Sequence, residues 1–299
     1  MIFEKILGNE SNKIFLNNIL KHNTVSHSYM FIGENSIGKK LFAKEFAKGI
    51  LCESDTSKPC GNCTSCIKFE NSNHPDFYIL DEEDGTIKNE QIREINKNIL
   101  EKPIESLKKV YIINNSENMT VQAQNSLLKT LEEPPEHAVI ILITSNENKM
   151  LTTIKSRCTK INFIPLNNSD IRTILRREYN IDNVSDFIFT FARGSVERTL
   201  KIQAKLDLYG DIQETFNDIK NIDALELLKL KEELAQNKED IYFILEYINA
   251  ILKDLSMNDS KYLNCIFIVE QTKDRLKRNN NFDMTIDNLL LKIWEEING

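Results

Sequence analysis

The sequence has no long apolar run, and this absence limits where the protein can act. No stretch approaches the ~18 consecutive apolar residues that a transmembrane helix needs. Residues 1–7 also lack the basic segment followed by an apolar segment that marks a secretory signal. We therefore expect a cytoplasmic protein with no membrane partner.

An excess of positive charge is also missing. The 38 Lys and Arg residues are outnumbered by 45 Asp and Glu residues, which gives a formal net charge of −7. This balance argues against a nucleic-acid-binding surface that covers the whole chain, although it leaves room for a local basic strip. The length of 299 residues allows two or three globular domains.

Cysteine is scarce except in one cluster. Four of the six cysteines are spaced C-x7-C-x2-C-x2-C, at Cys52, Cys60, Cys63 and Cys66. In a reducing cytoplasm such a cluster predicts a metal site before it predicts disulfides. Four thiolates suit tetrahedral Zn²⁺ and leave no open position for catalysis. We therefore predict a structural zinc that closes the loop of residues 52–66.

Residues 29–40 read as a short apolar strand, a glycine loop and the start of a helix. The spacing Gly33-x4-Gly38-Lys39 is that of the P-loop, in which backbone N–H groups and the lysine contact phosphates. The next position normally carries Ser or Thr, whose hydroxyl helps to hold Mg²⁺, but here it is Lys40. The sequence therefore predicts a P-loop and leaves open whether a nucleotide binds.

A second part of a magnesium site is missing after the apolar strand at residues 109–113. Nucleotide hydrolases carry acidic residues at the end of such a strand, whereas this chain carries Asn114 and Asn115. Amides are uncharged and cannot act as a general base. Glu117 is either a substitute carboxylate or a solvated charge at a helix start. We therefore expect little or no ATP hydrolysis.

Strand and helix patterns alternate in the first half of the chain and then change. The alternation predicts an α/β fold with a parallel sheet. Glu132-Glu133 before two prolines predicts a helix end and a turn. Beyond Pro165 only helical periodicity remains. The expected strands are residues 29–32, 76–80, 109–113, 139–143 and 160–164, and the clearest later helices are 239–255, 262–277 and 284–297.

Several segments together resemble the clamp-loader subunits of bacterial DNA polymerase III, which are three-domain AAA+ proteins. The matching segments are residues 27–31 before the glycine loop, the four-cysteine insertion, residues 109–113, residues 125–135 and Ser156-Arg157-Cys158. The resemblance implies an AAA+ P-loop domain over residues 1–164, with its zinc insertion at 52–66. A helical lid over residues 165–207 and a helical collar over residues 208–299 would follow.

Two subunit types fit this resemblance, the ATP-hydrolysing gamma/tau motor and the delta-prime type, which does not hydrolyse ATP. Lys40 and the pair Asn114-Asn115 favour the delta-prime type. The resemblance gives Arg157 the role of an arginine finger that acts in trans on the ATP of a neighbouring subunit. It places Arg198 near the lid sensor of the family, one residue out of register with the motor pattern.

The resemblance also implies partners. These are the motor subunits and the delta subunit, with the sliding clamp and primer-template DNA as indirect partners in the DNA polymerase III holoenzyme. Two other functions compete with this one, an autonomous ATPase and a zinc-dependent nucleic-acid-binding module. The second would need basic and aromatic residues interleaved with the cysteines, and around Cys60–Cys66 only Lys58, Lys68 and Phe69 are of these kinds.

Overall fold

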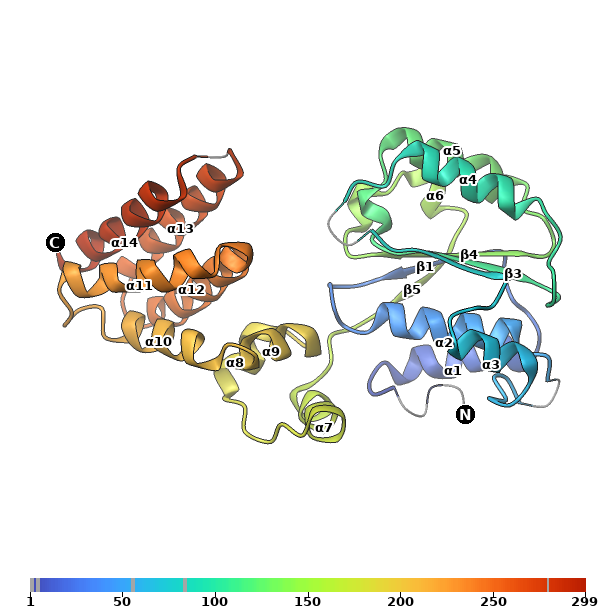
Figure 1. Ribbon diagram of the computed structural model, residues 1–299, viewed down its shortest axis with the longest axis horizontal. Coiled ribbons are helices and arrows are strands. Elements are labelled where there is room, and N and C mark those ends of the chain that lie inside the picture. Colours follow the sequence, from blue (N-terminus) through green and yellow to red (C-terminus); the bar gives the residue numbers. More distant parts are fainter. Residues whose placement is uncertain (1–2, 4–5, 55–56, 83–84, 279) are drawn as a thin grey trace. The chain divides into compact units, whose positions relative to one another are not determined.

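The computed structural model describes residues 3, 6–54, 57–82, 85–278 and 280–299. Residues 55 and 56 of the predicted zinc insertion, and the other omitted residues of the predicted domains, lie outside this part. The chain forms two compact units (Figure 1), Met1–Val184 with Ala192–Arg198, and Ser185–Phe191 with Thr199–Gly299. The division into three domains stays a prediction.

A five-stranded parallel sheet forms the centre of the first unit, with the strand order β2-β3-β4-β1-β5. Its strands are β1 (Ser28–Ile32), β2 (Phe77–Leu80), β3 (Lys109–Ile113), β4 (Ala138–Thr144) and β5 (Thr159–Asn162). Every residue of β3 and β4 is buried, as expected for central parallel strands that are covered on both faces. The predicted α/β fold with a parallel sheet is confirmed.

Helices cover both faces of this sheet (Figure 1). One face carries α1 (Glu10–Lys21), α2 (Lys39–Leu51) and α3 (Thr64–Glu70), and the other carries α4 (Asn89–Ile99), α5 (Val121–Glu132) and α6 (Thr152–Lys155). Because side chains alternate along a strand, Tyr29 and Phe31 enter the apolar cluster under α2. Met30 enters the opposite cluster, under α4 and α5. Helix α7 (Asn168–Tyr179) follows β5 in the same unit.

Strand β1 lies between β4 and β5, which both follow it in the sequence. In open parallel sheets, ligands bind beyond the carboxyl ends of the strands where the strand order reverses. The predicted P-loop begins at Gly33, directly after the last residue of β1. With a rise of ~3.3 Å per residue, the first and last Cα atoms of this strand lie about 13 Å apart.

The second unit is helical, and no described residue beyond β5 forms a strand. It contains α10 (Leu206–Asn217), α11 (Ala224–Gln236), α12 (Ile241–Ser256), α13 (Lys261–Lys277) and α14 (Phe282–Asn298), while α8 (Asp186–Ala192) and α9 (Val196–Gln203) each have residues in both units. Edge-to-face aromatic pairs join Phe191, Tyr209 and Tyr247 in its core. No helix in the described residues is long and apolar enough to cross a membrane.

Gly33 is required by packing, and this generates a first prediction. A Cβ atom on Gly33 would lie 2.7 Å from the carbonyl oxygen of Phe163 and 2.9 Å from Cδ1 of Ile37. Gly33→Ala must therefore displace backbone atoms, and we expect it to lower the free energy of unfolding by about 1–3 kcal/mol. Urea unfolding followed by circular dichroism measures this change.

The matched control is Gly210→Ala in α10, because a Cβ atom on Gly210 meets nothing within 4 Å. This change should stabilise the protein by about 0.5–1 kcal/mol, since alanine is the better helix former. A Gly33→Ala variant as stable as the wild type would contradict the packing argument.

Candidate functional site

The P-loop is closed around its own lysine. Gly38 precedes α2 with a φ of 91°, and Lys39 begins the helix with only 6% of its surface exposed. The Nζ atom of Lys39 donates to the carbonyl oxygens of Gly33, at 2.6 Å, and Glu34. Burial lowers the pKa of Lys39 to about 8, although the nearby carboxylates of Glu117 and Glu34 oppose this shift. A phosphate would have to replace these carbonyls as the acceptor.

Lys40 pairs with Asp81, the residue that follows β2. Asn114, which follows β3, donates from Nδ2 to Oδ1 of Asp81 at 2.7 Å. Burial opposes ionisation of Asp81, but the bonds from Lys40 and Asn114 hold its pKa below the usual range. In hydrolases Mg²⁺ links the P-loop hydroxyl to a carboxylate at a strand end. Here an ammonium group links the P-loop to the ends of β2 and β3.

Glu117 lies in the short helix η1 (Ser116–Asn118) after β3. Its Oε1 atom accepts hydrogen bonds from the backbone N–H of Ser145, at 3.0 Å, and from the Ser145 hydroxyl. Its Oε2 atom is buried and has no hydrogen-bond partner in the described part of the chain. Glu117 is therefore not a simple solvated charge, and its field acts on Lys39. Asn115 donates to the carbonyl oxygen of Glu82 at 3.2 Å.

Arg157 lies at the opposite edge of the sheet from the P-loop. Its carbonyl oxygen accepts a hydrogen bond from Oγ of Ser28, the first residue of β1, at 2.7 Å. Its guanidinium pairs through NH2 with Oε1 of Glu132 at 2.7 Å and donates from NH1 to the carbonyl oxygen of Thr153 at 2.9 Å. One third of the Arg157 side chain, 33%, is exposed. The two predicted functional residues, Lys39 and Arg157, are thus kept apart by the length of β1.

Arg198 is placed in the first turn of α9. Its backbone N–H donates to the hydroxyl of Ser195 at 3.2 Å, which is the usual arrangement at a helix start. The predicted lid arginine therefore belongs to the same unit as the P-loop. Its role towards a nucleotide stays a prediction.

The four clustered cysteines converge on one point. Their sulfur atoms all lie within 4.8 Å of one another, and those of Cys52 and Cys63 are 3.9 Å apart. Tetrahedral zinc with bonds of ~2.3 Å needs sulfur atoms about 3.8 Å apart. The backbone N–H groups of Cys60, Cys63 and Cys66 each donate to a cysteine sulfur at 3.3–3.4 Å, which stabilises thiolates. The cluster could therefore hold a metal ion, and its donors suit zinc.

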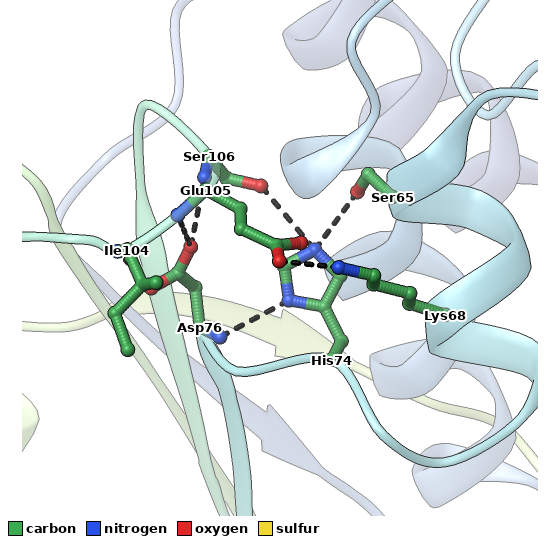
Figure 2. Close-up of polar contacts among 7 residues, drawn as sticks. All are labelled: Ser65, Lys68, His74, Asp76, Ile104, Glu105 and Ser106. Carbon is green, nitrogen blue, oxygen red and sulfur yellow. Dashed lines mark hydrogen bonds and ion pairs between the residues drawn. The ribbon is translucent and has the colours of Figure 1, made fainter.

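A buried histidine anchors α3, the helix that carries Cys66, to the rest of the unit (Figure 2). The Nδ1 atom of His74 accepts the backbone N–H of Asp76 at 3.1 Å, so its Nε2 carries the proton. Nε2 then donates to Oγ of Ser65 at 2.9 Å, and this hydroxyl donates to the carbonyl oxygen of Leu51 at 2.7 Å. Burial lowers the pKa of His74 although the nearby Asp76 carboxylate opposes this shift, and the lowered pKa favours the neutral ring.

Asp76 extends this network to the segment before β3 (Figure 2). Its carboxylate accepts the backbone N–H groups of Ile104, Glu105 and Ser106 at 2.7–2.8 Å. Burial opposes ionisation, but these three bonds hold the pKa of Asp76 below its usual range. Lys68 of α3 also pairs with Glu105. These contacts fix α3, which carries Cys66, to the segments that flank β2 and β3.

Comparison with known proteins decides the family. The chain matches the family described as DNA polymerase III, delta subunit, over residues 8–167. The chain belongs to this DNA polymerase III family. The predicted resemblance to clamp-loader subunits is thereby confirmed for the family, while the subunit type is not.

The relatives of this DNA polymerase III family member carry two kinds of name. The chain is 33% identical over 227 residues to the tau/gamma subunit of Haemophilus influenzae, which covers 74% of this chain and 33% of the relative. It is 38% identical over 151 residues to the delta' subunit of Bacillus subtilis, which covers 50% of this chain and 46% of the relative. The matches thus span from a third to less than half of these relatives.

A solved structure has the same fold. The structure of a DNA polymerase III gamma subunit-related protein from Thermotoga maritima matches with a TM-score of 0.53 and 17% identity, and the match covers 94% of this chain and 99% of that one. This likeness supports the arrangement of a P-loop α/β region followed by helices.

The buried Lys39 predicts a pH dependence of stability. Its pKa is about 8 in the folded protein and ~10.4 in an unfolded chain, so the unfolded chain binds the proton more tightly. The charged amine therefore destabilises the fold below pH 8, and this cost disappears as the pH rises towards 10. Between pH 7 and pH 10 the wild type should gain about 2–3 kcal/mol relative to Lys39→Met in urea unfolding. A difference that stays constant with pH would contradict this reading.

The cysteine geometry predicts the metal content. Protein purified without chelator should contain one zinc ion per chain, and Cys63→Ser should contain far less, because a three-thiolate site binds the metal more weakly. Elemental analysis by mass spectrometry measures this. Cys265→Ser is the control, since Cys265 is isolated in α13, and it should keep its zinc. Equal zinc content in Cys63→Ser and Cys265→Ser would contradict the assignment of the four cysteines as zinc ligands.

Proposed function

We propose that this chain is a delta-prime-type subunit of a DNA polymerase III clamp loader. It does not hydrolyse ATP itself, and it supplies Arg157 in trans to the nucleotide bound by a neighbouring motor subunit. Its partners are the motor subunits and the delta subunit, and it takes part in loading the sliding clamp onto primer-template DNA. Its four cysteines hold a structural zinc ion.

The position of Arg157 supports the action in trans and carries the proposal. A guanidinium stabilises a reacting phosphate through direct hydrogen bonds of ~2.7–2.9 Å. Arg157 is bound to Ser28 at the start of β1, whereas the P-loop follows the end of this strand, about 13 Å further along. Arg157 therefore lies at the opposite end of β1 from the P-loop of its own chain, and a nucleotide that it contacts would belong to another subunit.

The contacts of Lys40 support the lack of hydrolysis. Phosphoryl transfer depends on Mg²⁺ and on a carboxylate or amide that orients water. The carboxylate of Asp81 is already paired with the ammonium of Lys40 and the amide of Asn114. Mg²⁺ that binds the carboxylate of Asp81 would have to displace the positively charged Lys40.

A gamma/tau-type motor is the second candidate, because a relative of that name aligns with more of the chain, 74% against 50% for the delta' relative. The two candidates differ in one measurable property. A motor hydrolyses ATP with its own P-loop and needs Lys39, whereas a delta-prime-type subunit has no turnover of its own.

The proposal predicts the effect of Arg157→Ala in a complex reconstituted with the gamma/tau-type and delta subunits of the same organism. The nucleotide site that faces this chain should hydrolyse ATP about 10³-fold more slowly, as when other arginine fingers are removed. Single-turnover hydrolysis measures the change, because the ATP bound at this site of the variant complex should be hydrolysed as a separate slow phase. Arg157→Lys should rescue little of the loss, because lysine lacks the planar guanidinium.

Two controls accompany this experiment. Lys155→Ala removes a positive charge from α6, two positions away, and should behave as the wild type. The isolated chain should show no ATP turnover. Unchanged hydrolysis in the Arg157→Ala complex, or turnover by the isolated chain that Lys39→Ala abolishes, would refute the proposal.

A further inference from the structure

Helix α5 ends in two carboxylates, Glu132 and the capping residue Glu133. The C-terminal end of a helix carries a partial negative charge and favours cations, so this position disfavours both carboxylates. Within the described residues, only Glu132 of the two forms an ion pair, and its partner is the guanidinium of Arg157 at 2.7 Å. From the sequence these residues predicted only a helix end and a turn.

We infer that Glu132 is the positioning residue of Arg157, which holds the guanidinium in the orientation needed to meet the nucleotide of the neighbouring subunit. The inference rests on the proposed function and assigns a role that the proposed function leaves open. Glu132 itself touches no substrate and acts only through Arg157.

Both ends of the Arg157 residue are fixed. At the backbone, its carbonyl oxygen accepts the Ser28 hydroxyl at 2.7 Å, and its N–H donates to the carbonyl oxygen of Ile154 at 3.0 Å. At the tip, NH1 donates to Thr153 and NH2 pairs with Glu132. Thr153 lies in α6, which ends two residues before the arginine. Glu132 is therefore the contact that ties the tip to a separate element, α5.

These contacts leave hydrogen-bond donors for a phosphate. A guanidinium carries five N–H groups, and the contacts with Thr153, Ser156 and Glu132 involve only NH1 and NH2. No described residue accepts a hydrogen bond from Nε. The carboxylate can therefore orient the guanidinium while other N–H groups stay available.

Pre-ordering matters because arginine has a long, flexible side chain. Fixing it before the subunits meet reduces the entropy lost when it contacts the phosphate. Hydrolysis rates are sensitive to displacements of ~1 Å in such groups, which can cost about 100-fold. Without Glu132 the guanidinium would sample several rotamers, and productive geometry would be rarer.

The experiment uses the reconstituted complex with ATP and compares Glu132→Ala, Glu132→Gln and Glu133→Ala. Glu132→Ala should lower kcat at the site facing this chain by about 10- to 100-fold and leave KM for ATP unchanged. The kcat of Glu132→Gln should lie between those of Glu132→Ala and the wild type, because the amide oxygen still accepts a hydrogen bond. Glu133→Ala is the matched control and should equal the wild type.

A double-mutant cycle with Arg157→Ala separates positioning from a general structural role. If Glu132 acts through Arg157, the double variant should be no slower than Arg157→Ala alone. Additive losses, or a Glu132→Ala complex as fast as Glu133→Ala while Arg157→Ala is impaired, would overturn the inference alone. An Arg157→Ala complex as fast as the wild type would overturn both the inference and the proposed function.

Discussion

The structure depends on the placement of β1 between β4 and β5 in a parallel sheet. All strands run in the same direction. The C-terminal ends of the strands therefore lie together at one edge of the sheet, which is the edge with the P-loop. The starts of the strands lie at the other edge. The P-loop follows β1, and Arg157 is bound to the first residue of β1. One strand therefore separates the P-loop at one end of the sheet from the proposed arginine finger at the other.

At the edge with the P-loop, the ammonium of Lys40 supplies the positive charge that Mg²⁺ supplies in nucleotide hydrolases. Lys40 joins the P-loop to Asp81, and Asn114 completes the link to β3. These contacts stabilise the loop from within the chain, and Lys39 donates hydrogen bonds to loop carbonyls. At the opposite edge, the guanidinium of Arg157 is held by α5 and α6. The proposed division of labour follows from this contrast.

The sequence predicted the features that depend on local spacing. The apolar run of β3, the glycines of the P-loop and the spacing of Cys60, Cys63 and Cys66 each carry their own signal. The features that it missed join residues far apart in the chain, such as Lys40 with Asp81. The network of Ser65, His74 and Ser106 and the pair of Glu132 with Arg157 were missed for the same reason, because only the fold brings these side chains together.

The central claim is that the chemistry of this chain takes place on the nucleotide of another subunit. The most direct measurement is a structure of the assembled complex with a non-hydrolysable ATP analogue. Our account predicts the Arg157 guanidinium within ~3 Å of the γ-phosphate bound by the neighbouring subunit, with Lys40 still paired to Asp81. A structure in which Arg157 is remote from every nucleotide, and Mg²⁺ with ATP occupies the P-loop of this chain, would contradict it.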